Sequence, residues 1–399
     1  MATLTICLPT RNRQAYCIET IRAIADSASR DFEVVVADNS DDGSVLAAFF
    51  VGFADPRFRL IAPEGRVLSM VDNWERTMAA AQGRWIAFIG DDDYCDPRVA
   101  ELIRRYERMF PDVEAVGWNR MNFNWPDNRP RPTLATIPLS FDTYVAKKSL
   151  LADRLFRWSE GKRRPSAGFG AYHGAVKRSL MDRIRKKFGG RYFEHPMVDY
   201  ESSCKVIAEA KTLVHCQRPF SVLGACAASN SAGALSRKTM MERAKIFEEE
   251  TKDNIALDRS DFPFTLVDQG SSICVGVAAT TWWFCRTYGI DLTGFPENFA
   301  KAAIHECMSS PDIEEYEVKV AGFRRGFAAW DGGRWKDLFA PPPFAGNRIL
   351  NETSGVLNDI MYLAEAKVPA RTPYEFYRFG EHAIIAVDHL VAGTRTFAR

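Results

Sequence analysis

Short apolar runs and amphipathic stretches alternate along the chain before residue 91. The apolar runs have the length and flanking residues of buried strands, and they lie at Leu4–Pro9, Phe32–Ala37, Arg57–Pro63 and Arg84–Gly90. Two stretches between them, Ala15–Ala28 and Ser69–Gly83, place apolar residues at helical spacing. The order strand, helix, strand, strand, helix, strand predicts an open, mostly parallel α/β sheet flanked by helices.

Polar residues follow three of these strands at the point where each strand ends. They form the clusters Pro9–Arg13, Asp38–Ser44 and Asp91–Asp93. In open α/β sheets, ligands bind in the crevice beyond the carboxyl ends of the strands. The three clusters are therefore expected to converge on one binding crevice.

The rest of the chain changes character along its length. Asp112–Trp125 predicts a further pair of strands, and the proline-rich stretch Pro126–Pro138 predicts a loop. From about Arg237 long helical patterns dominate to the end. We therefore predict two domains, an α/β domain at residues 1–235 and a largely helical C-terminal domain at residues 236–399.

The composition narrows the class of protein. The formal net charge is +1 over 399 residues, so charge gives no argument for a nucleic-acid partner. Nine cysteines occur without a CxxC pair, which predicts reduced thiols in a cytoplasmic protein rather than a disulfide framework. The longest apolar run, Ile273–Cys285, is shorter than the ~20 residues of a membrane span. It predicts a buried helix, with an interfacial segment as the alternative.

Asp91, Asp92 and Asp93 directly follow an apolar strand and a glycine. Three adjacent carboxylates repel one another, and a divalent ion would cancel that repulsion. Hard oxygen ligands suit Mg²⁺ or Mn²⁺, which keep other positions open for phosphates. The alternative is an acidic surface turn in which Asp93 or Asp96 caps a helix. The position beside two other polar strand ends favours the metal site.

Several motifs in a fixed order resemble the family 2 glycosyltransferases of the GT-A fold. The resemblance covers about the first 235 residues and rests on the segments TICLPTRNR, FEVVVADNSDDGS, DNWERTMAAAQGRWIAFIGDDDY, YHGAVKRSLMDRI and PMVDYESSCKVIAEA. It implies that residues 1–235 form a nucleotide-sugar transferase domain that works with inversion. The helical region, residues 236–399, is then expected to contact the acceptor, a membrane surface or a second subunit.

The resemblance assigns the nucleotide to the strand ends. Asp38 matches the aspartate that reads the base and favours uracil or thymine, hence a UDP- or dTDP-sugar; it also suits the start of a turn. Pro9, Thr10 and Arg11 match the loop around the nucleoside. Arg11 is preferred over Arg13 as a contact, and both arginines also suit a solvated surface.

The metal motif departs from the family pattern. Gly90 stands where the usual Leu-Asp-x-Asp-Asp form has its first aspartate, which leaves a weakened or absent metal dependence open. Either Asp91 and Asp93 hold the ion, or Asp92 and Asp93 hold it while Asp91 lies near the ribose. We expect Asp93 to matter most and Asp91 second. Asn73, in the preceding helix, matches a family asparagine at the nucleotide site and equally suits a polar helix position.

The candidate for the general base is Asp199. In an inverting transfer a carboxylate takes the proton of the attacking hydroxyl, and the resemblance places that carboxylate at Asp199. The family often has Glu-Asp here, whereas this chain has Val198 before Asp199. Glu194 and Glu201 are rivals in the same segment, and Asp199 also suits the N-cap of the following helix.

Two histidines and one small-residue segment give weaker signals. His173, inside a matched segment, and His215 are candidates for a third metal ligand, although a lone histidine more often packs or faces solvent. Ser229–Gly233 has the small polar residues of a lid over the donor diphosphate, and equally those of a linker.

The basic stretches Gly161–Pro165 and Arg183–Arg191 usually indicate a solvated face. The alternative is a dock for an anionic membrane surface or a lipid-diphosphate acceptor. Trp282 and Trp283 are its apolar partners only if their helix lies at the surface.

Other protein classes compete with a glycosyltransferase. A sugar-1-phosphate nucleotidyltransferase needs a glycine-rich loop after its first strand, and PTRNRQAY contains no glycine. A dinucleotide oxidoreductase needs GxGxxG there, which is also absent. A non-catalytic nucleotide- or sugar-binding module stays open, because Asp199 lacks its acidic neighbour and Gly90 replaces an aspartate.

The resemblance also implies the partners. The donor is a nucleotide sugar and the acceptor a carbohydrate or lipid-linked hydroxyl compound, in polysaccharide or glycoconjugate biosynthesis, with Mn²⁺ or Mg²⁺ as cofactor. The expected location is the cytoplasm; peripheral contact with the inner face of the membrane and a homo-oligomer are open alternatives. Nucleic acid is not an expected partner.

Overall fold

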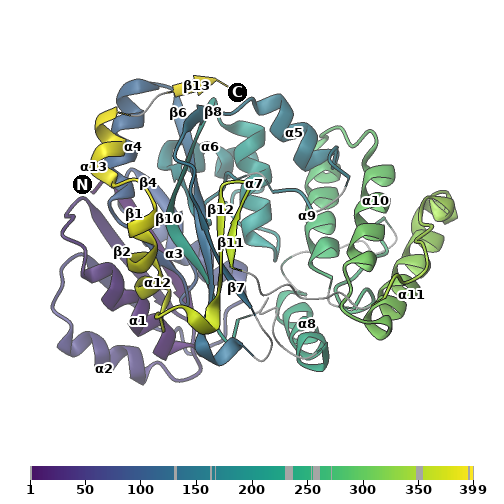
Figure 1. The fold of residues 1–399 in the computed structure, drawn as a ribbon, viewed down its shortest axis with the longest axis horizontal. Helices are drawn as coiled ribbons and strands as arrows, with labels where there is room; N and C mark the ends of the chain where they lie inside the picture. Colours follow the sequence, from purple (N-terminus) through teal and green to yellow (C-terminus); the bar gives the residue numbers. More distant parts are fainter. Residues whose placement is uncertain are drawn as a thin grey trace.

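The computed structural model describes most of the chain. The described ranges are residues 2–129, 133–161, 164–166, 168–229, 237–252, 254, 261–270, 272–346, 354–393 and 396–398. Figure 1 shows a central sheet with helices packed around it and a group of helices, drawn in green, beside it.

The first third of the chain folds largely as the hydrophobic pattern predicts. Four strands pair in parallel in the order β4-β1-β2-β3: β1 (Leu4–Thr10), β2 (Phe32–Asp38), β3 (Phe58–Ile61) and β4 (Trp85–Phe88). Helix α1 (Gln14–Ala25) follows β1, and α3 (Met70–Ala80) precedes β4. Ser69 caps α3, because its hydroxyl accepts a hydrogen bond from the N–H of Asp72 at 3.1 Å.

Before residue 91, the sequence pattern misses one helix. The structure has α2 (Ser44–Gly52) between β2 and β3, where a direct strand-to-strand connection is predicted. Its sequence, SVLAAFFVG, is almost entirely apolar, so it shows no alternation at helical spacing. Only Leu46 is buried, and Val51 is 90% exposed.

The second half of the sheet is mixed. The predicted strand pair at Asp112–Trp125 is wrong, because β6 (Val113–Asn124) is one long strand. Its neighbours come from far along the chain: β10 (Thr212–Ala225) in parallel and β9 (Gly174–Lys177) antiparallel. β9 also pairs with β4, so it joins the two halves of the sheet. The two-residue strand β5 (Tyr94–Cys95) pairs with β10.

The last part of the chain returns to the sheet. The predicted loop at Pro126–Pro138 contains β7 (Leu134–Pro138), which pairs with β12 (Ile360–Ala364) and through it with β11 (Gly355–Leu357). β13 (Thr396–Ala398) pairs with β8 (Thr143–Val145), and α12 (Pro373–Gly380) packs against β10. Figure 1 shows these yellow segments beside the sheet. The division at residue 235 stays a prediction, and the second range contributes both helices and strands.

Four helices make the C-terminal region largely helical, as predicted: α8 (Arg237–Thr251), α9 (Ile273–Tyr288), α10 (Phe295–Met308) and α11 (Ile313–Ala329). Helix α9 contains the longest apolar run, and Val277 and Phe284 on it are buried, so the predicted buried helix is confirmed. Across the described ranges, no helix is both long enough and apolar enough to cross a membrane.

Apolar cores cover both faces of the sheet. One contains buried residues of α1, α4 (Val99–Met109), α12 and α13 (Val387–Gly393). The other lies under α3, α5 (Lys148–Phe156), α6 (Arg178–Lys187) and α7 (Val198–Glu209). Short 3₁₀ helices complete the elements, at Pro126–Asn128, Trp330–Gly333, Lys336–Leu338, Glu365–Lys367 and Glu381–Ala383. Because the cores hold the strands from both sides, the residues at the strand ends are fixed in place.

Candidate active site

The predicted polar strand ends lie together at one edge of the sheet. Thr10 at the end of β1 is the parallel neighbour of Asp38 at the end of β2. The Thr10 hydroxyl donates a hydrogen bond of 2.6 Å to Oδ2 of Asp91, which follows β4. All three side chains are buried. Because β1 lies between β2 and β4, sheet pairing alone brings these ends together.

Arg13 neutralises Asp91. Nε of Arg13 donates to Oδ2 of Asp91 at 3.1 Å, and Nη2 lies 2.6 Å from Oδ1. Burial raises the pKa of Asp91 to about 7, although Arg13 acts in the opposite direction. Arg11, the preferred contact from sequence, instead pairs with Glu250 of α8 and lies 3.8 Å from Asp41.

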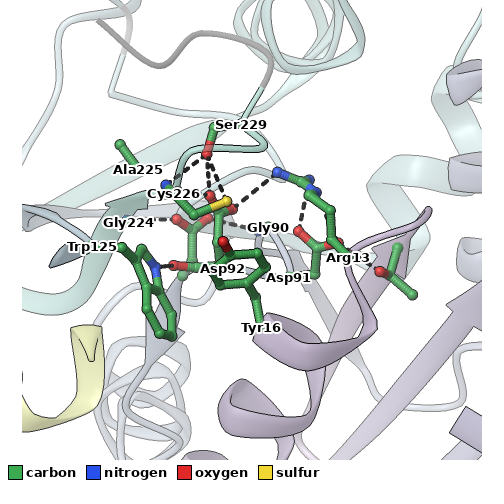
Figure 2. A network of polar contacts seen from close by, with 12 residues as sticks. Arg13, Tyr16, Gly90, Asp91, Asp92, Trp125, Gly224, Ala225, Cys226 and Ser229 are labelled. Atoms are coloured by element: carbon green, nitrogen blue, oxygen red, sulfur yellow. Dashed lines mark hydrogen bonds and ion pairs between the residues drawn. The ribbon is translucent and has the colours of Figure 1, made fainter. Parts of the chain in front are cut away.

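Asp92 joins the cluster to the segment after β10. Its Oδ2 accepts hydrogen bonds from the Ser229 hydroxyl and from the N–H of Cys226. Its Oδ1 lies 3.5 Å from Nη1 of Arg13. Figure 2 shows Asp92 between Arg13 on one side and Ser229 and Cys226 on the other. Of the predicted lid at Ser229–Gly233, only Ser229 lies within the described residues.

Asp93 is the most heavily bonded of the three aspartates. Three donors meet its Oδ2: the N–H of Gly90 at 2.7 Å, the Tyr172 hydroxyl at 2.8 Å and Nε2 of His173 at 3.0 Å. Oδ1 accepts from the N–H of Gly224 at 2.8 Å. Burial acts to raise the pKa of Asp93, but His173 and the hydrogen bonds outweigh it, so the pKa lies below its ordinary value.

His173 is held by hydrogen bonds from both ring nitrogens. Nε2 meets Asp93, and Nδ1 lies 2.8 Å from the hydroxyl of Ser221 on β10. Both nitrogens are therefore engaged with protein atoms, and His173 fixes the orientation of Asp93. His215 lies elsewhere: its Nε2 is 3.1 Å from Oδ1 of Asn119, and burial lowers its pKa to about 4.

The three carboxylates differ in how well they fit a divalent ion. In the part of the chain that the structure describes, no group of three or more His, Cys, Asp or Glu side chains is arranged to hold a metal. Two carboxylates suffice for Mg²⁺ or Mn²⁺ when phosphates and water complete the shell. Asp93 fits poorly, because four donors occupy its oxygens. Oδ1 of Asp91 is paired with Nη2 of Arg13 at 2.6 Å, and Oδ1 of Asp92 lies 3.5 Å from Nη1 of the same arginine. A divalent ion at these two oxygens would therefore share them with Arg13 or displace it.

Asp38 presents an unused acceptor at the end of β2. Its Oδ1 accepts a hydrogen bond from the N–H of Ser40, while its buried Oδ2 has no hydrogen-bond partner among the described residues. A buried acceptor without a donor costs free energy, which a ligand N–H would recover. Asn73 lies behind this strand end: its Nδ2 donates to the carbonyl of Ala37, and its Oδ1 accepts from Arg76.

Asp199 lies in the first turn of α7 and is partly exposed. It is not the N-cap, because the helix begins at Val198 and Met197 is the capping residue. Burial raises the pKa of Asp199, and backbone hydrogen bonds and the charges of Arg120 and Arg164 act in the opposite direction.

One loop connects Asp199 to the aspartate cluster. Tyr172 and His173 at its end bind Asp93. Two residues earlier, Gly170 packs so closely on α7 that a Cβ atom would lie 2.8 Å from Oγ of Ser203 and 3.6 Å from the carbonyl oxygen of Asp199. The loop therefore sets the position of α7 relative to the cluster.

The rival carboxylates belong to a structural network. Oε2 of Glu201 accepts hydrogen bonds from the N–H groups of Glu194 and His195, and its Oε1 lies 2.8 Å from Nζ of Lys205. Glu194 pairs with the same lysine at 2.6 Å and accepts a hydrogen bond from Tyr288. Lys205 is fully buried. These carboxylates balance a buried cation, whereas no contact of the Asp199 side chain with this cation is seen among the described residues.

The basic stretch Arg183–Arg191 is largely paired on the surface. Arg183 pairs with Glu114 at 2.8 Å, Lys187 with Glu209 at 2.5 Å and Arg191 with Asp72 at 2.6 Å. Lys162 and Arg163 of the other basic stretch lie outside the described residues. The ring of Trp282 lies edge-on to Trp330, and the ring of Trp283 is tilted against His195. Membrane contact stays a prediction.

Sequence reasoning missed several residues of the site. Tyr172 and Gly224 reach Asp93, and Ser221 holds His173, across large separations along the chain. The hydrophobic pattern of the sequence does not indicate these contacts, because it does not predict that β10 lies next to β6. Arg13 belongs to the motif PTRNR, but the direction in which its side chain points depends on the turn after β1.

The close approach of Gly224 to Asp92 gives a first testable prediction. A Cβ atom at Gly224 would lie 1.8 Å from the carbonyl oxygen of Asp92. We expect Gly224→Ala to lower the free energy of unfolding by about 1–3 kcal/mol, as overpacking does, measured by urea denaturation. Gly355→Ala is the matched control, because nothing lies within 4 Å of that position. Equal stability of the two variants would contradict the packing argument.

Comparison with known proteins places these features in a family. Residues 5–163 match the model of the family described as Glycosyl transferase family 2. "Uncharacterized protein MT1568" of Mycobacterium tuberculosis (strain CDC 1551 / Oshkosh) is 32% identical over 107 residues, which cover 26% of this chain and 32% of that protein. The chain thus spans about a third of the length of that relative.

Two solved structures are similar over most of the chain. S. aureus TarS 1–349 in complex with UDP-GlcNAc is 15% identical, with a TM-score of 0.43 and coverage of 85% of this chain and 89% of that chain. The mannosyltransferase PcManGT from Pyrobaculum calidifontis, in complex with GDP-Man and Mn²⁺, is 15% identical, with a TM-score of 0.37 and coverage of 84% of each. The family match agrees with the resemblance of the motifs up to GDDDY, whereas the motifs YHGAVKRSLMDRI and PMVDYESSCKVIAEA lie beyond residue 163. Residues 5–163 are thus similar to the glycosyl transferase family 2.

Proposed function

We propose that the protein is an inverting glycosyltransferase that moves a sugar from a UDP- or dTDP-sugar to a hydroxyl acceptor. The observation that carries this proposal is the buried cluster formed by Thr10, Asp38 and Asp91 at the ends of three parallel strands. The family match over residues 5–163 supports it. The acceptor class, a carbohydrate or lipid-linked compound in cytoplasmic polysaccharide or glycoconjugate assembly, follows from the family resemblance alone.

The nucleotide of the donor is proposed to bind at the ends of β1 and β2. The free Oδ2 of Asp38 suits the N3–H of uracil or thymine, because it is a buried acceptor without a donor. Cytosine and adenine lack an N–H at the matching ring position, and guanine carries its ring N–H on a larger ring system, so this acceptor favours uracil and thymine. Pro9, Thr10, Arg11 and Asn73 stay predicted contacts of the nucleoside.

The diphosphate is proposed to lie beside the aspartate cluster. A divalent ion held there would stabilise the negative charge of the leaving diphosphate. The proposed ligands are Asp91 and Asp93, with Asp92 and Asp93 as the alternative pair. Asp91 and Asp92 both face Arg13, and Asp93 is hydrogen-bonded to Gly90, Tyr172, His173 and Gly224.

Asp199 is proposed to act as the general base. The acceptor hydroxyl oxygen forms a bond to the anomeric carbon, and its proton passes to the Asp199 carboxylate. The bond between the anomeric carbon and the diphosphate oxygen breaks, and its electron pair leaves with the nucleoside diphosphate. Attack from the face opposite the leaving group inverts the anomeric configuration.

A thermal-shift screen tests the proposed donor class. UDP and dTDP are expected to raise the melting temperature more than GDP does, because a ligand that binds the native state stabilises it by about 2.7 kcal/mol at 100 times its Kd. Mn²⁺ should increase the shift. Asp38→Asn should remove the preference for pyrimidines, and Asp41→Asn, at an exposed position of the same loop, should keep it. No shift with any nucleotide would favour the non-catalytic module.

The pH dependence follows from the raised pKa of Asp199. A general base works only when it is deprotonated, so kcat/KM should be high above this pKa and fall as the pH drops through it. Because burial raises the pKa, the fall should begin above the ordinary value of about 3.9 for aspartate. The measurement is kcat/KM against pH at saturating metal. A rate that stays flat to about pH 4 would contradict the assignment.

A further inference from the structure

Two buried side chains hold the backbone of the aspartate cluster. The hydroxyl of Thr20 on α1 donates toward the carbonyl oxygens of Asp91 and Asp93, which each lie 2.9 Å from it. Nε1 of Trp125, the residue after β6, donates to the carbonyl oxygen of Asp92 at 2.9 Å. Figure 2 shows the contact of Trp125 with Asp92. Each carbonyl oxygen of the cluster is therefore bonded to a side chain that the proposed reaction does not use.

Thr20 reaches the cluster from the same side of α1 as Arg13. Arg13, Tyr16 and Thr20 are three and four residues apart, a spacing that places them on one face of a helix. Arg13 contacts the carboxylate of Asp91, and the ring of Tyr16 packs edge-on against Trp125, with 5.0 Å between the ring centroids. One face of α1 thus contacts the cluster at a carboxylate and at the backbone, and it also supports Trp125.

The contacts of the carboxylates and those of the carbonyl groups respond differently to a ligand. A cation or a donor that binds at Oδ1 of Asp91 or Asp92 competes with Arg13, which lies 2.6 and 3.5 Å from these oxygens. The carbonyl oxygens face Thr20 and Trp125 instead, so such a ligand leaves their hydrogen bonds in place.

The carbonyl contacts restrict the direction of the carboxylates. A peptide unit is planar, and only φ and ψ rotate freely. Hydrogen bonds at three successive carbonyl groups hold the planes on both sides of Asp92 and of Asp93. They thereby fix φ and ψ of these two residues, and with them the direction of each Cα–Cβ bond.

We propose that Thr20 and Trp125 are positioning residues that keep the carboxylates of the aspartate cluster in the direction that binds the donor diphosphate. This inference rests on the proposed function, in which the diphosphate lies beside the cluster. Removing either donor takes a hydrogen bond from a buried carbonyl group and frees a peptide plane to rotate. The affinity contributed by the diphosphate should then fall. The affinity contributed by the base should not, because Asp38 lies at the end of β2.

The test uses uridine and UDP as probes. Each is titrated into the 399-residue protein at saturating Mn²⁺ by isothermal titration calorimetry, and the ratio of the two Kd values gives the gain in affinity from the diphosphate. Thr20→Val replaces the hydroxyl by a methyl group of similar size. We expect it to reduce this gain by about 5- to 10-fold, as loss of one hydrogen bond predicts, while uridine binds as it does to the wild type. Trp125→Phe, which keeps an aromatic ring and loses the N–H, should act in the same way.

Two further variants are the controls. Thr20→Ser keeps the hydroxyl and should keep the gain of the wild type. Thr281 is buried on α9, and its hydroxyl donates to the carbonyl of Val277 in the same helix at 3.0 Å. Thr281→Val therefore removes the same group outside the cluster and should also leave the gain unchanged.

The outcomes separate this inference from the proposed function. An unchanged gain in both Thr20→Val and Trp125→Phe would overturn the inference, and so would an equal loss of affinity for uridine and UDP, because that indicates general damage to the fold. Trp125→Phe decides the matter if Thr20→Val does not fold. A wild type that binds neither uridine nor UDP would overturn the proposed function, and this inference with it.

Discussion

Asp199→Asn is expected to lower kcat by about 10²- to 10⁴-fold, the usual contribution of a general base. Asparagine keeps the size of the side chain and loses the site that accepts the proton. KM for the donor should change little, because Asp199 lies in the first turn of α7 and the proposed nucleotide contacts lie on β1 and β2. The measurement is release of nucleoside diphosphate with the donor that the thermal-shift screen identifies.

Glu297→Gln provides the control for Asp199→Asn. Glu297 is an exposed carboxylate in the first turn of α10, so the same change of charge occurs at another helix start. Its kcat should equal that of the wild type. If Asp199→Asn keeps full activity while its melting temperature is unchanged, the base is another group, and the pH profile of the variant shows whether a carboxylate still titrates.

Asp93→Asn is expected to destabilise the fold by about 3 kcal/mol. An amide has one acceptor oxygen, whereas Asp93 accepts from Gly90, Tyr172, His173 and Gly224. At least one buried donor loses its partner, at about 1–3 kcal/mol each, and the new amide N–H₂ faces donors. Urea denaturation measures the change.

The same variant separates the two roles of Asp93. Asp41→Asn, at an exposed position, should stay within about 0.5 kcal/mol of the wild type. If Asp93→Asn is as stable as the wild type but loses the effect of Mn²⁺ on UDP binding, Asp93 is a metal ligand, as the motif predicts, and the structural role is wrong. Loss of stability with intact Mn²⁺ dependence would support Asp91 and Asp92 as the ligands.

The sequence by itself determined the parallel half of the sheet and the place of the site. Strand and helix periods before residue 91 are local properties, and ligands bind at the carboxyl ends of parallel strands. Asp38, Thr10 and Asp91 could therefore be assigned to one crevice. The order of the motifs along the chain also indicated a resemblance to the family 2 glycosyltransferases, which the match over residues 5–163 supports, because motif order can be read without knowledge of the contacts.

Only the tertiary structure decided which partner each aspartate has. Asp93 meets Gly224 and Tyr172 through β10 and the loop before β9, more than 70 residues away along the chain. Local patterns do not encode such pairings, since a strand such as β6 can pair with any other strand of suitable length. For the same reason β7, β12 and the return of the C-terminal segment to the sheet were not foreseen.

The structure also decided the electrostatics of the site. Arg11 and Arg13 are two residues apart and look alike in sequence, but the turn after β1 directs Arg13 to Asp91 and Arg11 to Glu250. Asp199 is the predicted base in sequence, with Glu194 and Glu201 as rivals in the same segment. Lys205 is buried and forms ion pairs with both Glu194 and Glu201. A buried cation without a partner would lower the stability of the fold. Sequence could not show this pairing, because the charge balance of the interior depends on contacts between distant segments.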